Sequence, residues 1–161
     1  MRLQRNASNS SGKIRLDMNR LDSKFRQDYL NLISASKNIA KVVATVTFST
    51  KVRPEQSPDD RKKSAETDLY FMPYMTVNDL LIGFAHYNDV IREVAQAEKT
   101  LLIGGENTIP GDAKHFVDSV HFTDAGSVAM ADRVANALIA SAAVQALVAQ
   151  KLQAHAARSP G

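Results

Sequence analysis

Two short apolar runs, one on each side of a helical stretch, limit what this chain can fold into. The run KVVATVTFST at 41–50 is rich in β-branched residues and almost continuously apolar. The run TLLIGG at 100–105 is also apolar and ends in two glycines. Strands buried on both faces of a parallel sheet have this composition, because neither face meets water. The sequence therefore predicts two buried parallel strands.

The stretch between these runs has the pattern of an amphipathic helix. Its apolar residues recur three and four positions apart over 76–99, and Thr76 with Asp79 matches a helix-capping box. The residues of this apolar stripe are Leu80, Leu81, Phe84, Tyr87, Ile91 and Val94. A helix that joins two parallel strands predicts an α/β fold with a right-handed crossover.

Helices are also predicted on both sides of this unit. One covers about 22–38 with Asp22 or Ser23 as its N-cap, and another begins at Thr123 and runs to about Ala149. Two strands form only a short sheet, and small sheets are marginally stable on their own. The fold class we expect is therefore a partial three-layer α/β/α domain that lacks its first strand–helix units.

The domain organisation follows from where the polar segments lie. We expect one folded domain over 21–150, a flexible polar arm at 1–20 and a disordered tail at 151–161. Within the arm, KIRLDMN at 13–19 alternates apolar and polar residues, which is typical of a short strand or an extended segment. Residues 51–75 hold three of the five prolines, and loops of this length are often functional.

The composition argues against several functional classes. The formal net charge of +3 is small and the Lys and Arg residues are scattered, whereas a nucleic-acid surface needs a clustered basic stripe. There is no cysteine, which excludes thiolate chemistry and fits a cytoplasmic protein. The N-terminus lacks the apolar core of a secretory signal, and no apolar run is long enough to span a bilayer. We expect no nucleic-acid partner and no membrane span, with localisation left open.

The stretch HFVDSVHFTDAG at 115–126 holds the strongest candidate site. Asp118 and His121 lie on a predicted loop after the second strand, where α/β folds build their sites. From this spacing the carboxylate can reach Nδ1 of His121, which leaves Nε2 free to face a nucleophile on another loop. Ser119 lies between the two residues and is interpreted as a turn residue, because a nucleophile must approach from elsewhere.

Two other interpretations of this pair stay open. Asp118 and His121 could be ordinary polar residues of a loop, or they could bind a metal together with His115. Asp112 and Asp124 lie nearby in the sequence. Ligands spaced in this way align only on a helix, and the proline and glycine at 110–111 favour an irregular loop. The spacing therefore favours a carboxylate–histidine pair over a metal site.

The quoted residues resemble the C-terminal part of the SGNH/GDSL hydrolase family. The last block of that family is Asp-x-x-His on a loop before the closing helix, usually with a threonine and a glycine shortly after. The matching residues here are Asp118, His121, Thr123 and Gly126. YNDVIREVA at 87–95 and the run at 25–50 are similar to the elements that precede this block, so the resemblance covers about residues 25–147.

The resemblance implies an SGNH/flavodoxin-like fold and serine-dependent hydrolysis of an ester or acetyl group, with no metal or organic cofactor. Asp118 would orient His121, and His121 would act first as general base and then as general acid. The family's nucleophile lies in a Gly-Asp-Ser turn, and its oxyanion hole adds a glycine and an asparagine. Here the Gly-Asp pair at 111–112 is followed by alanine, and TVND at 76–79 lacks the glycine and fits a helix cap. The implied enzyme is therefore truncated and inactive by itself.

Three functional classes follow from the sequence, and the third is a small metal- or ligand-binding α/β protein. The first is the C-terminal portion of an SGNH-type esterase that acts on a small-molecule ester once an N-terminal half completes it. The second is a non-catalytic remnant or interaction module. Such a module would form a homo-oligomer or bind a partner through the exposed edge of the strand at 41–50.

Overall fold

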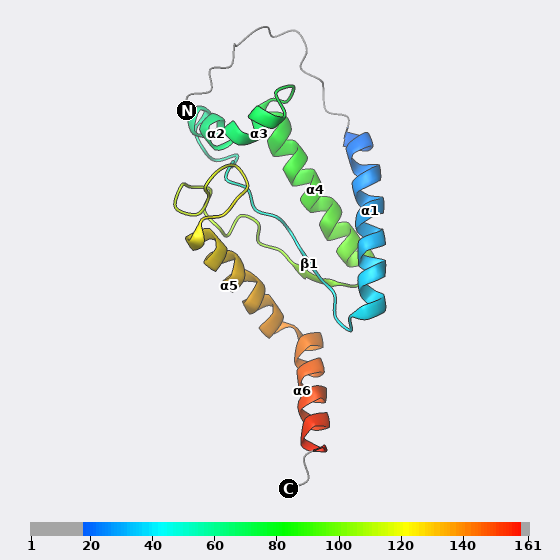
Figure 1. The fold of residues 1–161 in the computed structure, drawn as a ribbon. Helices are drawn as coiled ribbons and strands as arrows, with labels where there is room; N and C mark the ends of the chain where they lie inside the picture. The colour runs from blue at the N-terminus through cyan, green and yellow to red at the C-terminus, as the bar shows by residue number, and fades with distance from the viewer. Residues whose placement is uncertain (1–17, 159–161) are drawn as a thin grey trace.

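The structure is a computed structural model, and it describes residues 18–158 (Figure 1). Within this range the chain forms six helices and two strands. In chain order these are α1 (Met18–Ile39), β1 (Ala44–Val46), α2 (Pro58–Ser64), α3 (Glu66–Phe71), α4 (Val77–Ala97), β2 (Leu101–Ile103), α5 (Asp124–Ala140) and α6 (Ala142–Ala156). Helices surround a small sheet, and the expected mixed α/β architecture is confirmed at this level.

The two strands form a parallel pair, as the apolar runs predicted. Ala44 lies opposite Leu101 and Val46 lies opposite Ile103. The ladder extends past the strand ends, because Thr47 donates its N–H to the Ile103 carbonyl at 3.1 Å. Both strands are nevertheless short, and the run at 41–50 is regular strand only over Ala44–Val46.

Helix α4 connects the two strands and begins as the sequence predicted. The Thr76 hydroxyl accepts the Asp79 N–H, and the Asp79 carboxylate accepts the Thr76 N–H, so the capping box is confirmed. On one face α4 packs against α1, where Ile33, Val90 and Val94 form a buried cluster. Figure 1 shows the strands between this helix pair on one side and α5 on the other.

The excursion at 51–75 contains two helices, where we expected a long loop. Ser57 caps α2 by accepting the Asp60 N–H, and Pro58 occupies the first turn, where a missing N–H costs nothing. Ala65 lies between α2 and α3 and is fully buried against Val52, Met75 and Leu80. These helices therefore form because they close a second small core over the N-terminal half of α4.

Helix α1 begins before the N-cap that we predicted. It starts at Met18. The residues between Met18 and the predicted N-cap include no proline or glycine, so nothing in them prevents a helix. Most of the predicted arm at 1–20 and of the predicted strand at 13–19 lies outside the described residues. The part of both that is described is helical.

The single helix predicted from Thr123 to about Ala149 is divided into α5 and α6. The two helices meet at Ser141 and are bent by 71°. The Ser141 hydroxyl caps α6 by accepting the Val144 N–H, which favours a new helix start at this point. Helix α6 then continues to Ala156, so the first part of the predicted disordered tail is helical.

No single helix of residues 18–158 is long and apolar enough to cross a bilayer. Taken together, the bent pair formed by α5 and α6 has the length and the apolar composition of a span, and this likeness is one of length and composition only.

Candidate functional site

The loop between β2 and α5 is held together by a short antiparallel bridge. Phe116 pairs with Phe122, and their rings lie 4.9 Å apart between centroids. Val117 donates its N–H to the His121 carbonyl at 2.9 Å, and Thr123 donates to the His115 carbonyl at 3.0 Å. Because Phe116 is only 1% exposed, this hairpin is anchored in the protein interior. It presents His121, at the end of the turn at 118–121, to solvent.

The structure brings Asp118 and His121 together within this turn. Nδ1 of His121 lies 2.8 Å from Oδ2 and 3.0 Å from Oδ1 of Asp118. The same carboxylate accepts the main-chain N–H of Val120 at 3.0 Å and of His121 at 2.9 Å. The carboxylate is therefore held by two contacts with the imidazole and by two main-chain N–H groups, and the predicted pairing of these side chains is present.

These contacts keep Asp118 ionised. Partial burial by itself would raise the pKa of Asp118, but the main-chain N–H groups of His121 and Val120 and the imidazole of His121 lower this pKa to about 2. A carboxylate that stays charged fixes the imidazole with its proton on Nδ1. The ring then has its unprotonated Nε2 on the opposite side, and 76% of the His121 side chain is exposed. The pair can therefore accept a proton from a group outside the turn.

Ser119 is not placed to act as a nucleophile. It is 1% exposed, and its hydroxyl oxygen accepts the main-chain N–H of Asp68 at 3.3 Å. Its carbonyl accepts the N–H of Lys51 at 2.8 Å. Ser119 thus connects the turn to the 51–75 segment, in agreement with its interpretation as a structural residue.

A second pair in the same loop repeats this geometry. Nδ1 of His115 lies 2.7 Å from Oδ1 of Asp112, and that oxygen also accepts the N–H groups of Lys114 and His115 at 3.0 Å. The sequence contains the signal for this pair, since DAKH and DSVH share the Asp-x-x-His spacing. The geometry is therefore a local property of this spacing. What distinguishes the two histidines is exposure, because only 14% of the His115 side chain is exposed.

The residues of the metal interpretation form two separate carboxylate–histidine pairs in the structure. His115 is bound to Asp112, whereas His121 is bound to Asp118. Across residues 18–158, no group of three or more His, Asp or Glu side chains is arranged to hold a metal ion.

The start of α5 locks the hairpin in place. Thr123 caps this helix by accepting the Gly126 N–H at 3.2 Å, and its hydroxyl donates to the Lys114 carbonyl at 2.5 Å. A Cβ at Gly126 would lie 2.0 Å from the His115 carbonyl oxygen, so only glycine allows helix and loop to approach this closely. The threonine and glycine after the Asp-x-x-His block are therefore required by packing.

Three polar residues near this end of the sheet had no signal in the sequence; Asp68 and Arg53 are buried, and Arg133 is half-buried. Arg133 on α5 donates to the Ser49 hydroxyl and the Gly105 carbonyl, both at 3.0 Å, and thereby joins the ends of both strands. Asp68 on α3 is 7% exposed, and its Oδ2 has no hydrogen-bond partner. Burial and the charge of Asp118 raise the pKa of Asp68. Arg53 is the third, and it borders a pocket.

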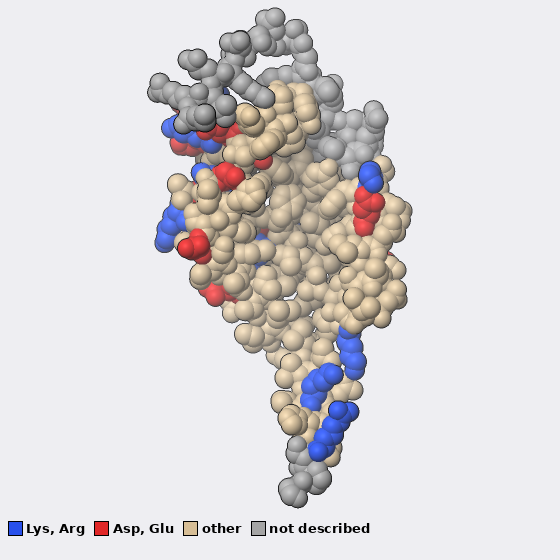
Figure 2. All heavy atoms as spheres, in the orientation of Figure 1, with Lys and Arg blue, Asp and Glu red and all other residues tan. Residues whose placement is uncertain are grey.

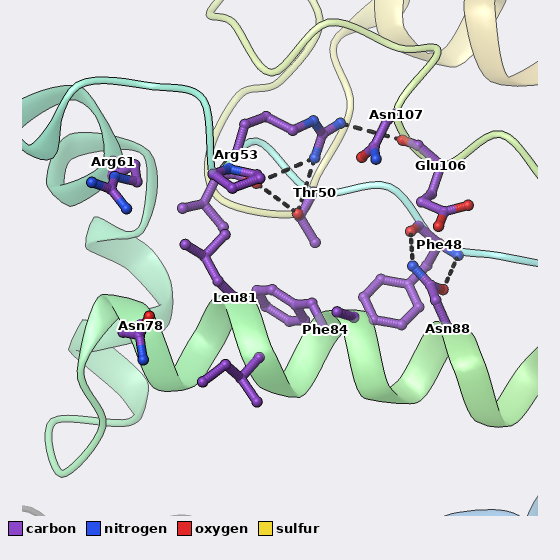
Figure 3. Close-up of a pocket in the computed structure, with 14 residues that line it drawn as sticks. Phe48, Thr50, Arg53, Arg61, Asn78, Leu81, Phe84, Asn88, Glu106 and Asn107 are labelled. Atoms are coloured by element: carbon purple, nitrogen blue, oxygen red, sulfur yellow. Dashed lines mark hydrogen bonds between the residues drawn. The ribbon is translucent and has the colours of Figure 1, made fainter.

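This pocket has a volume of about 370 Å³ and lies beyond the carboxyl ends of both strands (Figure 3). Its floor is formed by Phe48 together with Leu81 and Phe84 of α4. The centroids of the two phenylalanine rings lie 5.6 Å apart. At one end Asn88 donates to the Phe48 carbonyl and accepts the Phe48 N–H, both at 3.0 Å. The pocket therefore combines an apolar floor with polar walls.

Comparison of the chain with protein-family models, with curated proteins and with solved structures finds no match. The resemblance to SGNH hydrolases therefore remains a prediction from the residues quoted above.

Proposed function

We propose that this chain supplies the acid–base half of a serine esterase site of the SGNH type. Asp118 orients His121, and His121 accepts the proton of a serine hydroxyl that a separate polypeptide segment provides. The single observation that carries this proposal is the Asp118–His121 geometry, with Nδ1 on the carboxylate at 2.8 Å and the ring exposed. The substrate class is an ester or acetyl group, as the resemblance implies.

The proposed reaction follows from the position of the proton. As the serine oxygen attacks the ester carbonyl, its proton moves to Nε2 of His121, and the imidazolium is stabilised by the ionised Asp118. The same proton is then donated to the departing alkoxide, which leaves an acyl-serine. Water attacks this ester in the second half, again with Nε2 as base, and the acid is released.

Hydrolysis of p-nitrophenyl acetate by the purified chain is the first test. Without a serine opposite His121 and without oxyanion donors, we expect no burst and no turnover above that of free imidazole at equal concentration. Turnover well above that level, and abolished by His121→Ala, would show that the chain contains its own nucleophile and would overturn the proposal.

A chimera provides the complementary test. Residues 18–158 would replace the last two strand–helix units of an SGNH esterase, whose own first units supply serine and oxyanion donors. We expect hydrolysis that falls ~10⁴-fold in Asp118→Asn, because the imidazole then takes the wrong tautomer. Asp112→Asn is the matched control and should retain activity. A folded, active chimera that is indifferent to Asp118→Asn would contradict the proposal.

A second candidate function is a module that pairs with another copy of itself. Val43 and Thr47 direct their main-chain groups toward β2, so Ala44 and Val46 direct theirs away from it. The side of β1 that faces away from β2 is therefore an open edge of the sheet, and no further strand among the described residues pairs with it. In Figure 2 few Lys, Arg, Asp or Glu side chains lie in the middle of the face between α5 and α1, so repulsion between like charges would not oppose contact with a second copy there.

Light scattering after size exclusion tests this second function. Antiparallel pairing of two copies about Thr45 would place Ala44 opposite Val46 of the other copy, with each residue donating and accepting one hydrogen bond. We expect a dimer that Ala44→Pro dissociates by removing two donors. Leu102→Pro on the opposite edge is the control. A monomer at all concentrations would exclude this function.

A further inference from the structure

The lining of the pocket beyond the strand ends contains two arginines, Arg53 and Arg61, and one carboxylate, Glu106. Arg53 is 4% exposed and directs its guanidinium into the pocket wall (Figure 3). Its Nη atoms donate only to neutral oxygens, which are the Thr50 hydroxyl at 3.1 Å and the carbonyls of Val52 at 3.3 Å, Glu106 at 3.3 Å and Ile109 at 2.9 Å. Burial lowers the pKa of Arg53, whereas the negative charges of Glu55 and Glu106 act in the opposite direction.

The other charged groups of the lining leave this imbalance in place. Glu106 is the lining carboxylate, and it is already bound by Arg92. Arg61 on α2 also lines the pocket, forms no ion pair with any described residue, and has a buried Nε without a hydrogen-bond partner. Neither guanidinium group therefore forms an ion pair with a described carboxylate, although the charges of Glu55 and Glu106 act on Arg53 from farther away.

The remaining lining is apolar or carries neutral amides. The side chains of Phe48, Leu81 and Phe84 form a continuous floor, and Figure 3 shows Asn78 near the Arg61 end and Asn107 near the Glu106 end. A volume of about 370 Å³ falls in the range of small-molecule sites, which combine mostly apolar walls with a few oriented polar groups. The chemistry that fits is an aliphatic body with one negative charge.

We propose that this pocket binds a small amphiphilic anion, with its aliphatic part on the Phe48–Leu81–Phe84 floor and its charged group at Arg61, whose Nε has no hydrogen-bond partner. The inference concerns binding alone and is independent of the proposed esterase role. A chain that binds such anions without supporting hydrolysis in any chimera would lose the proposed function and keep this one.

Titration of the ¹⁵N-labelled chain with hexanoate, followed by NMR, tests the inference. We expect saturable shifts of the amides around the pocket with a Kd on the order of 1 mM, as is ordinary for a ligand of this size. Octanoate should bind roughly tenfold more tightly, because it buries two more methylene groups. Hexyl phosphate replaces the carboxylate head and distinguishes carboxylate from phosphate ligands, while hexanol should bind at least tenfold more weakly than hexanoate.

Two pairs of variants separate binding from stability. Arg61→Gln should weaken hexanoate binding about tenfold, whereas Lys62→Gln on the same helix should not, since Lys62 is exposed and outside the lining. Ala85→Leu places a side chain in the pocket and should abolish binding, whereas Ala97→Leu at the end of the same helix should leave it unchanged. Shifts that are the same for hexanoate and hexanol, or that persist in Ala85→Leu, would overturn the inference. The absence of any saturable shift would overturn it as well.

Discussion

Asp118 accepts hydrogen bonds from both the main chain and the ring of His121, so one carboxylate fixes the position and the orientation of the same residue. This arrangement links protein stability to pH. The folded pKa of about 2 lies below the ordinary value of 3.8, so the ionised side chain stabilises the fold above about pH 4. The stabilisation is lost as pH falls toward 2 and Asp118 takes up a proton in the folded state as well.

Asp118→Asn tests this linkage. We expect the free energy of unfolding to fall by about 1–2 kcal/mol at pH 7 and the difference from the unmodified chain to disappear near pH 2. Urea unfolding at a series of pH values measures both quantities. An unchanged difference across this range would mean that the ionised carboxylate contributes nothing.

The tautomer of His121 is a second consequence of the same contact. Because the carboxylate lies on Nδ1, we expect the neutral ring to carry its proton there, which ¹⁵N–¹H correlation spectra report directly. Asp118→Ala should return the ring toward the Nε2–H tautomer. Asp112→Ala should alter His115 and leave His121 as it was. An Nε2–H ring in the unmodified chain would contradict the assignment.

Gly126 should be among the least replaceable residues of the site. In Gly126→Ala the added carbon would lie 2.0 Å from the His115 carbonyl oxygen, and we expect a loss of ~1–3 kcal/mol despite the better helix propensity of alanine. Gly104→Ala is the matched control, since a Cβ there meets nothing within 4 Å. Chemical unfolding of both variants compares them. Equal stability would refute the packing argument.

Asp68 is expected to destabilise the fold at neutral pH. Its pKa is raised in the folded state, so folding favours the protonated form and stability decreases as pH rises through and above the ordinary value of 3.8. Asp68→Asn should therefore raise the melting temperature at pH 7, with a gain that shrinks below pH 4. A lower melting temperature at pH 7 would show that the carboxylate has a partner that stabilises it.

Asn88 on α4 holds the main chain of Phe48 through two hydrogen bonds. Asn88→Ala removes both hydrogen bonds to Phe48 and leaves two partly buried main-chain groups unpaired, for an expected loss of about 2–3 kcal/mol. Asn136→Ala on the exposed face of α5 should change stability by less than about 0.5 kcal/mol. Denaturant titration distinguishes the two, and similar losses would count against the special role of Asn88.

The features that the sequence predicted correctly are those that neighbouring residues determine. The capping box of Thr76 and Asp79 needs only four consecutive residues, and the contact between Asp118 and His121 lies within one turn. The two parallel strands were recognisable because each is a short apolar run, and because a stretch with the periodicity of an amphipathic helix lies between them in the chain. Each of these is specified locally, so a pattern in the chain is enough to find it.

The features that were missed depend on residues far apart or on weak local signals. Arg133 reaches strand ends 84 and 28 positions away, and nothing near it in the chain marks that contact. Helices α2 and α3 have no apolar stripe of their own and form around the burial of Ala65. The break at Ser141 interrupts a stretch whose composition favours a helix on both sides, and its local signal is one serine that caps the second helix.

The amide of Asn88 occupies both main-chain positions of Phe48 and so acts as a stop on the open side of the sheet. A strand that joined β1 from this side could pair with Ala44 and Val46 but would have to turn away before Phe48. The part of Phe48 that no further strand can cover lines the pocket above α4.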